Sequence, residues 1–474
     1  MSAKLPLCVD LDGTLIHSDM LLESFVRLLR QHFLSIFLLP FWLLQGRARL
    51  KHEIARRVTI DYACLPYNER LLAYLGEEKQ KGRPIVLVTA SDQRIAEGVA
   101  AQLGLFDAIL ASDGKRNLKA GRKAALLREK YGEGGFDYVG NELADLPVWQ
   151  QARTALVVSR SPALKKRLSS RANVVWLETD RQAGFPASIL RALRPHQWAK
   201  NLLVFVPLLL AHSYFDRERV LSTLWAFVSF SLCASAVYIF NDLMDLEADR
   251  RHPEKKHRPF AAGDLPIHAG LGLSVVLLVL SALIARSISE DYLLVFGIYF
   301  VSTTAYSLGL KAVALLDVFI LAGLYTIRVL AGIFAADVAL SFWLLALSLF
   351  LFFSLAMLKR YSELYNLEQR EQRKMRVRGY TTDDQHILAL LGVASGYISV
   401  LVLALYITTP EHMVEYRRPE FLWFVFPALL YWISRVWLLA CRGRMNEDPV
   451  LFALRDVPSY VIALIAAAGV ALAL

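Results

Sequence analysis

Two short stretches of this 474-residue sequence place carboxylates where they could do chemistry. Residues 241–249 read NDLMDLEAD and directly follow a long apolar run. Residues 5–16 read LPLCVDLDGTLI, in which Asp10 and Asp12 follow a short apolar segment. Carboxylates are costly beside hydrocarbon, so a cluster at a membrane edge indicates a site that holds positive charge. Two aspartates beyond a buried strand suit a nucleophile and an acid/base partner.

The polar residues of 241–249 would share one face if the preceding helix continued through them. At about 100° per residue, Asn241, Asp242, Asp245 and Asp249 fall within about 100° of one another. Carboxylates that repel one another are tolerated together when a cation bridges them, and oxygen ligands suit Mg²⁺ shared with substrate phosphates. We therefore predict a magnesium–diphosphate site here, with a solvated charged loop as the alternative.

Further polar side chains follow the predicted elements of the first half. A second apolar run, 83–91, is a predicted strand, 117–132 is a predicted helix, and 136–149 begins with another strand. Side chains at the carboxyl ends of parallel strands meet at one sheet edge. The candidates for that edge, besides Asp10 and Asp12, are Thr89, Lys119, Lys123, Asn141 and Asp145.

In this order, the motifs closely resemble the haloacid dehalogenase superfamily over about residues 1–160. The resemblance implies a Rossmann-like α/β domain with a helical cap and a Mg²⁺-dependent phosphatase. Asn141 stands where the family pattern has aspartate, which predicts weaker metal binding or lost activity. The implied roles are nucleophile and metal ligand for Asp10, general acid and base for Asp12, phosphate binding for Thr89 and Lys123 (with Lys119 as the alternative lysine), and metal binding for Asn141 and Asp145.

The cap is expected at about residues 18–80. Its most apolar part, 33–44, is too short for a membrane span, which needs about 20 residues. Two interpretations stay open: a helix in the core of the cap, or an interfacial helix that lowers the domain onto a membrane.

Composition divides the chain into two parts. It is 55% hydrophobic with a mean hydropathy of +0.39, and the apolar residues concentrate in the second half. We predict a soluble α/β domain over 1–178, a linker over 179–199, and an all-α membrane domain over 200–474. Nine spans are expected, at about 200–215, 220–240, 268–288, 291–310, 313–336, 340–358, 386–408, 421–440 and 456–474.

Charge and cysteine usage narrow the class further. The net charge of +10 accompanies no nucleic-acid motif, and Lys and Arg gather in the loops expected on the cytoplasmic side. The four cysteines lie far apart, so neither a zinc site nor a disulfide framework is predicted, and the N-terminal residues do not resemble a signal peptide. We expect a multi-pass protein of the bacterial inner membrane with its soluble domain and active sites in the cytoplasm, and without nucleic-acid partners.

The second half resembles the UbiA-type intramembrane prenyltransferase superfamily over roughly 190–474. The resemblance rests on the NDxxDxxxD pattern and on RPHQWAKN just before the first span. It implies Mg²⁺ on a diphosphate leaving group, with Asp242 and Asp245 as catalytic residues. The family's second DxxxD motif is replaced here by Lys359, Arg360 and Glu363, and such cations suit phosphate oxygens.

Three other segments resemble one branch above all, the polyprenyl-phosphate (decaprenyl-phosphate) phosphoribosyltransferases. They are RRHPEKKHRPFAAG (250–263), YSLGLK (306–311) and LDVFILAGLYTIRVLAG (316–332). The implied substrates are phosphoribosyl diphosphate and a polyprenyl phosphate, and a homo-oligomer is allowed for. Asp317 and Arg328 are expected either to pair structurally or to act in the site. The candidate phosphate ligands are Lys256, Arg258, Lys311, Lys359 and Arg360.

These resemblances predict a bifunctional enzyme. The membrane domain would transfer 5-phosphoribose to the lipid, and the soluble domain would then remove the 5-phosphate. One alternative is prenyl transfer from an isoprenoid diphosphate to an aromatic acceptor. Another is a membrane-tethered phosphatase whose helices only bind lipid.

Overall fold

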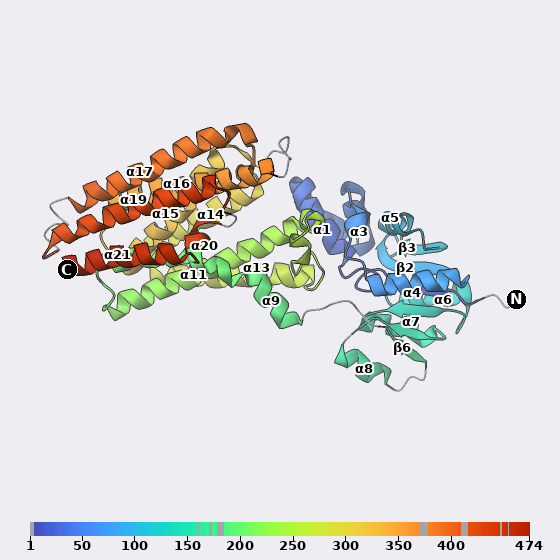
Figure 1. Ribbon diagram of the computed structural model, residues 1–474. Coiled ribbons are helices and arrows are strands. Elements are labelled where there is room, and N and C mark those ends of the chain that lie inside the picture. The colour runs from blue at the N-terminus through green and yellow to red at the C-terminus, as the bar shows by residue number, and fades with distance from the viewer. Residues whose placement is uncertain are drawn as a thin grey trace. The chain divides into compact units, whose positions relative to one another are not determined.

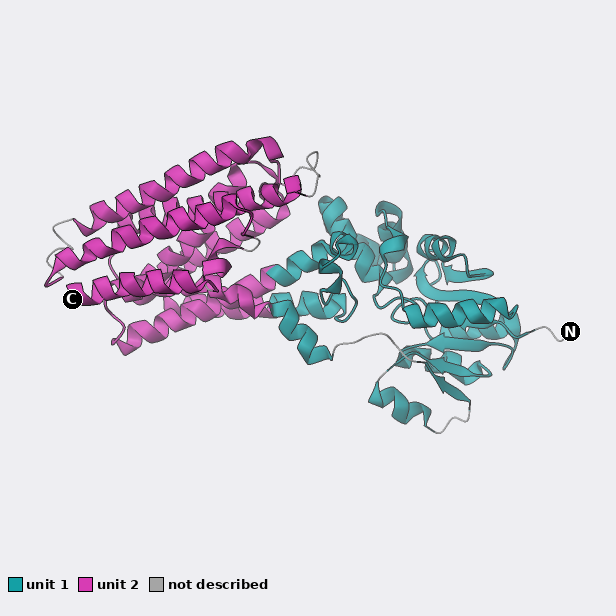
Figure 2. Ribbon diagram, in the orientation of Figure 1, with its two compact units in different colours: residues 1–193, 238–275 teal, residues 194–237, 276–474 magenta. Residues whose placement is uncertain are grey.

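The computed structural model divides into two compact units (Figures 1 and 2). Unit 1 comprises residues 1–193 and 238–275, and unit 2 comprises 194–237 and 276–474. The structure describes residues 4–159, 161–169, 173–177, 184–369, 378–408, 416–445, 448–453 and 455–474. Residues 179–183 of the predicted linker (179–199) and residues 370–377 of the predicted basic loop therefore lie outside the described residues.

Unit 1 is built on a six-stranded parallel sheet with the order β3-β2-β1-β4-β5-β6. Leu7 on β1 is in register with Ile85 on β2 and Asp137 on β4, so these three strands end at one edge. The predicted parallel α/β domain is thus confirmed. The strands are β1 (Leu7–Val9), β2 (Ile85–Asp92), β3 (Ala108–Ser112), β4 (Asp137–Gly140), β5 (Ala155–Val157) and β6 (Val174–Trp176).

Helices cover both faces of this sheet because alternate strand residues point to opposite sides. Leu7 and Val9 pack with residues of α4 and α5 on one face. Cys8 packs with residues of α6 and α7 on the other. The helices are α1 (Met20–Gln31), α2 (Leu39–Leu44), α3 (Arg47–Arg57), α4 (Glu69–Gln80), α5 (Gln93–Leu103), α6 (Gly121–Tyr131), α7 (Leu146–Gln151), α8 (Pro162–Leu168) and α9 (Phe185–Leu193).

The cap occupies the connection between β1 and β2. Helices α1 and α3 and the short α2 share a small core of Leu28, Trp42 and Ile54. The 3-10 helix η1 (Phe33–Leu38) has no buried residue, and in α2 only Trp42 is buried. A cap-core helix over 33–44 is therefore the wrong interpretation, because this segment turns its apolar side chains outward.

Within the described residues, unit 2 is almost entirely helical. Two of its helices, α11 and α13, continue into unit 1. Residues 195–205 form the 3-10 helix η4 (Pro195–Phe205). The α-helices are α10 (Val206–Leu210), α11 (Arg217–Met244), α13 (Ile267–Ile288), α14 (Glu290–Leu308), α15 (Leu316–Ala336), α16 (Phe342–Gln369), α17 (Gln385–Ile407), α19 (Val425–Cys441), α20 (Pro449–Ala453) and α21 (Val457–Ala473).

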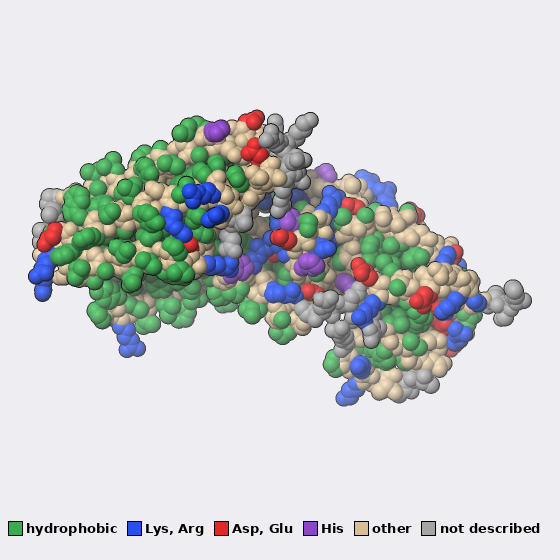
Figure 3. All heavy atoms as spheres, in the orientation of Figure 1, with side chains coloured by type: hydrophobic (Ala, Val, Ile, Leu, Met, Phe, Trp, Pro, Cys, Tyr) green, Lys and Arg blue, Asp and Glu red, His purple; other side chains and the backbone are tan. Residues whose placement is uncertain are grey.

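Within the described residues, six helices are long and apolar enough to cross a membrane: 217–244, 267–288, 316–336, 342–369, 382–407 and 419–441. The predicted count of nine is not confirmed. The run at 200–215 is divided between η4 and α10, the first turn of α14 carries Glu290 and Asp291, and α21 is only 17 residues long. Figure 3 shows hydrophobic side chains spread over the surface of these helices, as expected for lipid-facing positions.

Candidate functional site

The first candidate site lies at the carboxyl edge of the unit 1 sheet, where β1 ends at Val9. Asp10 and Asp12 follow in the next turn, and Asp10 is 6% exposed. Asp12 accepts hydrogen bonds from the Met20 backbone (2.7 Å) and from the Ser91 hydroxyl (2.8 Å). Both carboxylates are held in place before any substrate binds.

Lys123 balances the charge of Asp10. Its Nζ donates to Asp10 Oδ1 (2.7 Å) and to the Tyr138 hydroxyl (2.8 Å), and it lies 4.0 Å from Asp145 Oδ1. Lys123 is 4% exposed, whereas Lys119 is exposed. Of the two candidate lysines, the fold therefore brings Lys123 to the predicted nucleophile.

Asn141 and Asp145 complete this edge after β4. The backbone N–H groups of Asn141 and Glu142 donate to Asp145 Oδ2. Asn141 Oδ1 accepts from the Thr14 hydroxyl (3.1 Å). Gly13 has a φ of +74°, and a Cβ there would lie 2.3 Å from Asn141 Nδ2, so both conformation and space require glycine.

Burial shifts the acid–base properties of this edge. Burial, reinforced by Asp145 and Asp12 and opposed by Lys123, raises the pKa of Asp10 to about 7. Burial also raises the pKa of Asp12 to about 6. Burial lowers the pKa of Lys123, but Asp10 and Asp145 outweigh that effect and raise it, so Lys123 stays protonated. Burial therefore favours the protonated form of both aspartates.

Two features of β2 differ from the sequence-based expectation. The strand continues to Asp92, so the predicted phosphate ligand Thr89 is fully buried within it rather than at its end. Ser91 donates to Asp12 instead, and its own backbone N–H bonds to Thr89 Oγ1 (2.9 Å). Ser91 is the last residue of the apolar run 83–91, and the strand is irregular between Val88 and Asp92, where the Ser91 hydroxyl reaches Asp12.

Lys51 is a site residue that the sequence analysis missed. It comes from the cap helix α3, and its Nζ donates to the Ala90 carbonyl (2.6 Å). Burial lowers the pKa of Lys51, while the charge of Asp12 opposes that effect. The cap thus brings a cation to the edge that carries Asp12.

We expect Lys51→Met to weaken the binding of a phosphate monoester. A hydrogen bond to a charged group contributes about 1.5–3 kcal/mol, so KM should rise about 10- to 100-fold. Steady-state kinetics on a soluble phosphate monoester would measure it. Arg56→Met, at an exposed position of the same helix, is the matched control. An unchanged KM in the Lys51 variant would exclude the residue from the substrate site.

The second candidate site is the NDLMDLEAD segment, which belongs to unit 1. Helix α11 ends at Met244 and α12 (Leu246–Arg251) begins after Asp245, so the predicted uninterrupted helix is wrong. The i→i+4 pattern nevertheless survives, since Asp249 N–H bonds to the Asp245 carbonyl (2.8 Å).

Asp242 and Asp249 lie together around one cation. Arg258 Nη1 donates to Asp242 Oδ1 (3.1 Å) and to Asp249 Oδ2 (2.7 Å). Both aspartates are at most 4% exposed. Asn241 is half-buried one residue before Asp242. Two buried carboxylates are thus brought to the guanidinium of Arg258, and their predicted role as magnesium ligands stays a prediction.

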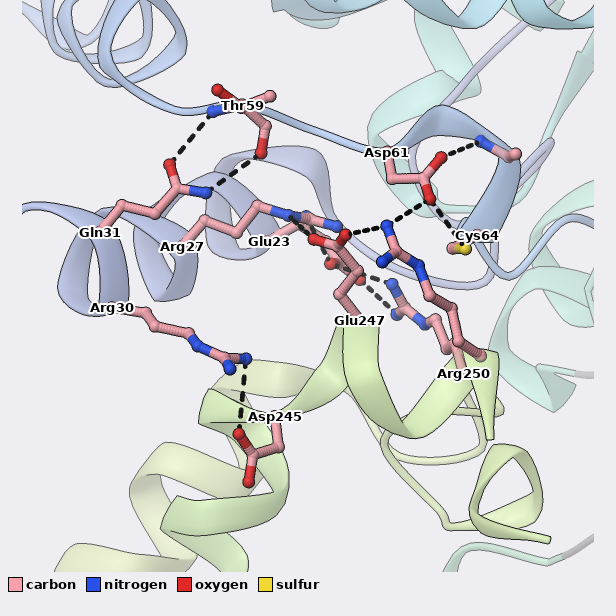
Figure 4. A network of polar contacts seen from close by, with 12 residues as sticks. Glu23, Arg27, Arg30, Gln31, Thr59, Asp61, Cys64, Asp245, Glu247 and Arg250 are labelled. Atoms are coloured by element: carbon pink, nitrogen blue, oxygen red, sulfur yellow. Dashed lines mark hydrogen bonds and ion pairs between the residues drawn. The ribbon is translucent and has the colours of Figure 1, made fainter. Parts of the chain in front are cut away.

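Asp245 points instead toward the cap helix α1 (Figure 4). Arg30 Nη1 lies 3.4 Å from Asp245 Oδ1 and donates to the Met244 carbonyl (3.2 Å). Nearby, Arg250 Nη2 donates to Glu23 Oε1 (2.5 Å). Burial raises the pKa of Glu23, but Arg250 and Arg27 outweigh it and hold that pKa below its usual range. The cap and the acidic segment therefore form one ion-pair network.

Unit 2 carries its own cluster of cations, around Asp448. Lys200 and Lys359 each donate to Asp448 Oδ2 (2.9 Å). Burial raises the pKa of Asp448, but the two lysines hold it well below its usual range. Lys200 belongs to the RPHQWAKN segment, so the fold joins that segment to Lys359. Lys200 and Asp448 were not predicted as site residues.

Arg360 and Arg328 are buried among polar partners. Arg360 donates to Asp317 (2.5 Å) and Glu363 (2.5 Å), so two carboxylates already balance its charge. Arg328 donates to Asn201 Oδ1 (2.8 Å) and the Tyr299 hydroxyl (3.1 Å). Among the described residues, Asp317 pairs with Arg360, and Arg328 donates to Asn201 and Tyr299.

The remaining predicted phosphate ligands lie in short 3-10 helices. Lys256 is exposed in η5 (Lys255–His257) and Lys311 is half-buried in η6 (Leu310–Ala312). Their role in phosphate binding stays a prediction.

The donor sets suit Mg²⁺ at both sites of unit 1. In the described part of the chain, no three His, Cys, Asp or Glu side chains form a ready-made metal cluster. Yet Asp242 and Asp249 converge on the Arg258 guanidinium, and Asp10 and Asp145 converge on Lys123. The positive side chains of Arg258 and Lys123 thus mark where each pair of carboxylates faces positive charge. Carboxylate oxygens are the ligands that Mg²⁺ prefers.

Comparison with known proteins agrees with this division. Residues 201–471 match the UbiA prenyltransferase family, and residues 7–149 match the haloacid dehalogenase-like hydrolases. The match to the first family covers more than half of the chain. Together with the six apolar helices, it makes this an integral membrane protein.

Three relatives extend the comparison. Protein y4nM of Sinorhizobium fredii, which is uncharacterized, is 37% identical over 98% of this chain and 91% of its own length. Nodulation protein NoeC of Azorhizobium caulinodans is 37% identical over 59% of this chain and 90% of its own. Decaprenyl-phosphate phosphoribosyltransferase of Mycobacterium tuberculosis is 40% identical over 40% of this chain and 65% of its own. The chain therefore belongs to the UbiA prenyltransferase family and carries a haloacid dehalogenase-like domain before its membrane helices.

Proposed function

We propose that the protein transfers 5-phosphoribose from phosphoribosyl diphosphate to a polyprenyl phosphate and then removes the 5-phosphate. The observation that carries the proposal is the pairing of a buried Asp10–Lys123 phosphatase edge with a UbiA domain in one chain. A phosphoribosylated lipid retains a phosphate monoester, whereas a prenylated aromatic ring offers a phosphatase nothing to cleave. The similarity to decaprenyl-phosphate phosphoribosyltransferases supports the same donor and acceptor.

In the transfer step, a lipid phosphate oxygen attacks C1 of the ribose. The bond from C1 to the diphosphate oxygen breaks, and its electron pair leaves with the diphosphate. Arg258, which lies between Asp242 and Asp249, can neutralise phosphate oxygens. Asn241, Asp242, Asp245 and Asp249 would hold Mg²⁺ at this site, and Asp10, Asn141 and Asp145 at the other, where the ion offsets phosphate charge.

In the hydrolytic step, Asp10 attacks the phosphorus of the 5-phosphate and forms an aspartyl-phosphate. The ester bond from phosphorus to the ribose oxygen breaks, and Asp12 donates a proton to the leaving oxygen. Asp12 then accepts a proton from the water that hydrolyses the aspartyl-phosphate. Lys123, which donates to Asp10, lowers the repulsion between that carboxylate and the incoming phosphate.

The proposed setting is the bacterial inner membrane, with both sites on the cytoplasmic face. Positive charge in the loops expected on that side supports this orientation. Phosphoribosyl diphosphate is water-soluble and would reach the site from the cytoplasm, while the polyprenyl phosphate acceptor would stay in the bilayer. Mg²⁺ at both sites and a homo-oligomeric assembly remain proposals.

Product analysis tests the transfer reaction. The full-length protein in nanodiscs would receive phosphoribosyl diphosphate labelled in its ribose, Mg²⁺ and a polyprenyl phosphate. We expect the label in the lipid fraction as ribose. If only an isoprenoid diphosphate with an aromatic acid reacts, prenyl transfer to an aromatic ring is the activity. If neither pair reacts while a phosphate monoester is hydrolysed, the membrane helices serve only to bind lipid.

A further inference from the structure

Residues 33–44 form an apolar arm on the cap, made of η1 and α2. Large side chains along it are strongly exposed: Phe33 is 62% exposed, Phe37 74% and Leu44 88%. Leu34, Leu38, Phe41 and Leu43 are also exposed, while Trp42 is buried in the cap core and the half-buried Leu39 packs against it. Single exposed apolar residues are common on protein surfaces, but a contiguous exposed apolar segment of this kind marks an interaction surface.

The charges around the apolar arm favour a lipid surface. The arm and its flanking residues 31–46 contain no Asp or Glu. Arg30 precedes it, and Arg47 and Arg49 follow it at the start of α3, all three exposed. Aromatic and aliphatic side chains flanked by arginines are typical of segments that lie in the interface of a membrane with anionic lipids.

A contact within unit 1 places the arm near a membrane edge. Arg30 donates to the carbonyl of Met244, the last residue of α11, which is long and apolar enough to span a bilayer. Phe33, the first residue of the arm, follows Arg30 by three positions. A bilayer that ends near Met244 would therefore be within reach of the exposed side chains.

We propose that the apolar arm inserts into the headgroup region of the bilayer that the protein itself spans. Arg30, Arg47 and Arg49 would contact anionic headgroups while Phe33, Phe37, Phe41 and Leu44 enter the acyl boundary, a depth of about 5–10 Å. Lipid binding by the arm does not depend on the reaction. Its consequence, delivery of the phosphatase edge to a phosphate on a lipid, rests on the proposed function.

Spin labelling of the full-length protein in nanodiscs of phosphatidylethanolamine and phosphatidylglycerol tests the insertion. The label would be placed at Phe37→Cys after Cys64 and Cys441 are changed to serine, because Cys8 and Cys233 are buried. We expect the label to collide with oxygen and to be shielded from a water-soluble nickel chelate. Leu143→Cys, half-exposed on the same unit, is the matched control and should show the opposite preference.

Two outcomes would overturn the proposal. Nickel access at position 37 equal to that at position 143 would mean that the arm lies in water. Protection from both probes would mean that protein, such as a second copy of the chain, covers it. Neither readout needs enzymatic turnover, so failure of the proposed function would leave this result unaffected.

A kinetic test addresses the consequence for catalysis. The triple variant Phe33→Ser, Phe37→Ser and Phe41→Ser removes exposed side chains only, so the fold should persist. We expect about a tenfold rise in KM for a lipid-linked phosphate monoester and no change for a soluble one. Equal effects on both substrates would argue against delivery to the lipid.

Discussion

Asp10→Asn should make the protein accumulate lipid-linked ribose 5-phosphate where the wild type forms lipid-linked ribose. Asparagine keeps the shape of the side chain but is not a nucleophile, so hydrolysis should fall by at least about 10³-fold. Transfer should continue, because its predicted ligands lie in 241–249 and not at the sheet edge. Labelled phosphoribosyl diphosphate followed by lipid extraction and phosphate analysis would measure both effects in one experiment.

A matched control separates this loss from a general disturbance of the domain. Asp113 is an exposed aspartate of the same unit whose carboxylate accepts hydrogen bonds from the Lys115 and Arg116 backbones. Asp113→Asn should leave hydrolysis within about twofold of wild type, as is usual for surface substitutions. If wild type and Asp10→Asn both end at lipid-linked ribose 5-phosphate, the transferase assignment stands and the phosphatase has another substrate.

Asp242→Asn should abolish transfer while preserving hydrolysis of a soluble phosphate monoester. Asp242 is 4% exposed and shares Arg258 with Asp249, so the change removes one of two buried carboxylates from the predicted magnesium site. We expect transfer to fall by about 10³-fold, in the range seen when a single charge-stabilising group is removed. Arg258 would still pair with Asp249, which should maintain the local fold.

The readouts for this variant are label in the lipid, phosphate release from a soluble monoester, and the thermal unfolding temperature. Glu254→Gln removes an exposed carboxylate a few residues beyond the motif and serves as the control. It should transfer at the wild-type rate. Transfer by Asp242→Asn within tenfold of wild type would show that the NDLMDLEAD segment does not hold the leaving group.

The sequence predicted which strands end at the sheet edge, because buried parallel strands appear as short apolar runs. Short apolar runs followed by Asp10, Asn141 and Asp145 indicate parallel strands, whose carboxyl ends meet at one edge. It could not choose between Lys119 and Lys123, because both belong to the same predicted helical segment. In the structure α6 begins at Gly121, so Lys119 lies before the helix and is exposed, whereas Lys123 is buried against Asp10.

The spacing of residues along the sequence could not predict contacts between residues far apart in the chain. Lys200 and Asp448 are 248 positions apart, yet both lie beside Lys359 once the helices pack. Lys51 likewise reaches the Ala90 carbonyl only because the cap folds back over the sheet edge. In each case the chemistry of the residue was visible, but its partner depended on packing.

The sequence by itself determined which residue types were available and where membrane helices could form. The DxDGT and NDxxDxxxD patterns, the apolar runs and the basic loops are local features, so composition and spacing reveal them. Tertiary structure decided their pairing: the break at Asp245, the turn of that residue toward Arg30, and the outward face of Phe33–Leu44. Those outcomes depend on which surfaces pack together, and packing energy is shared among residues distant in sequence.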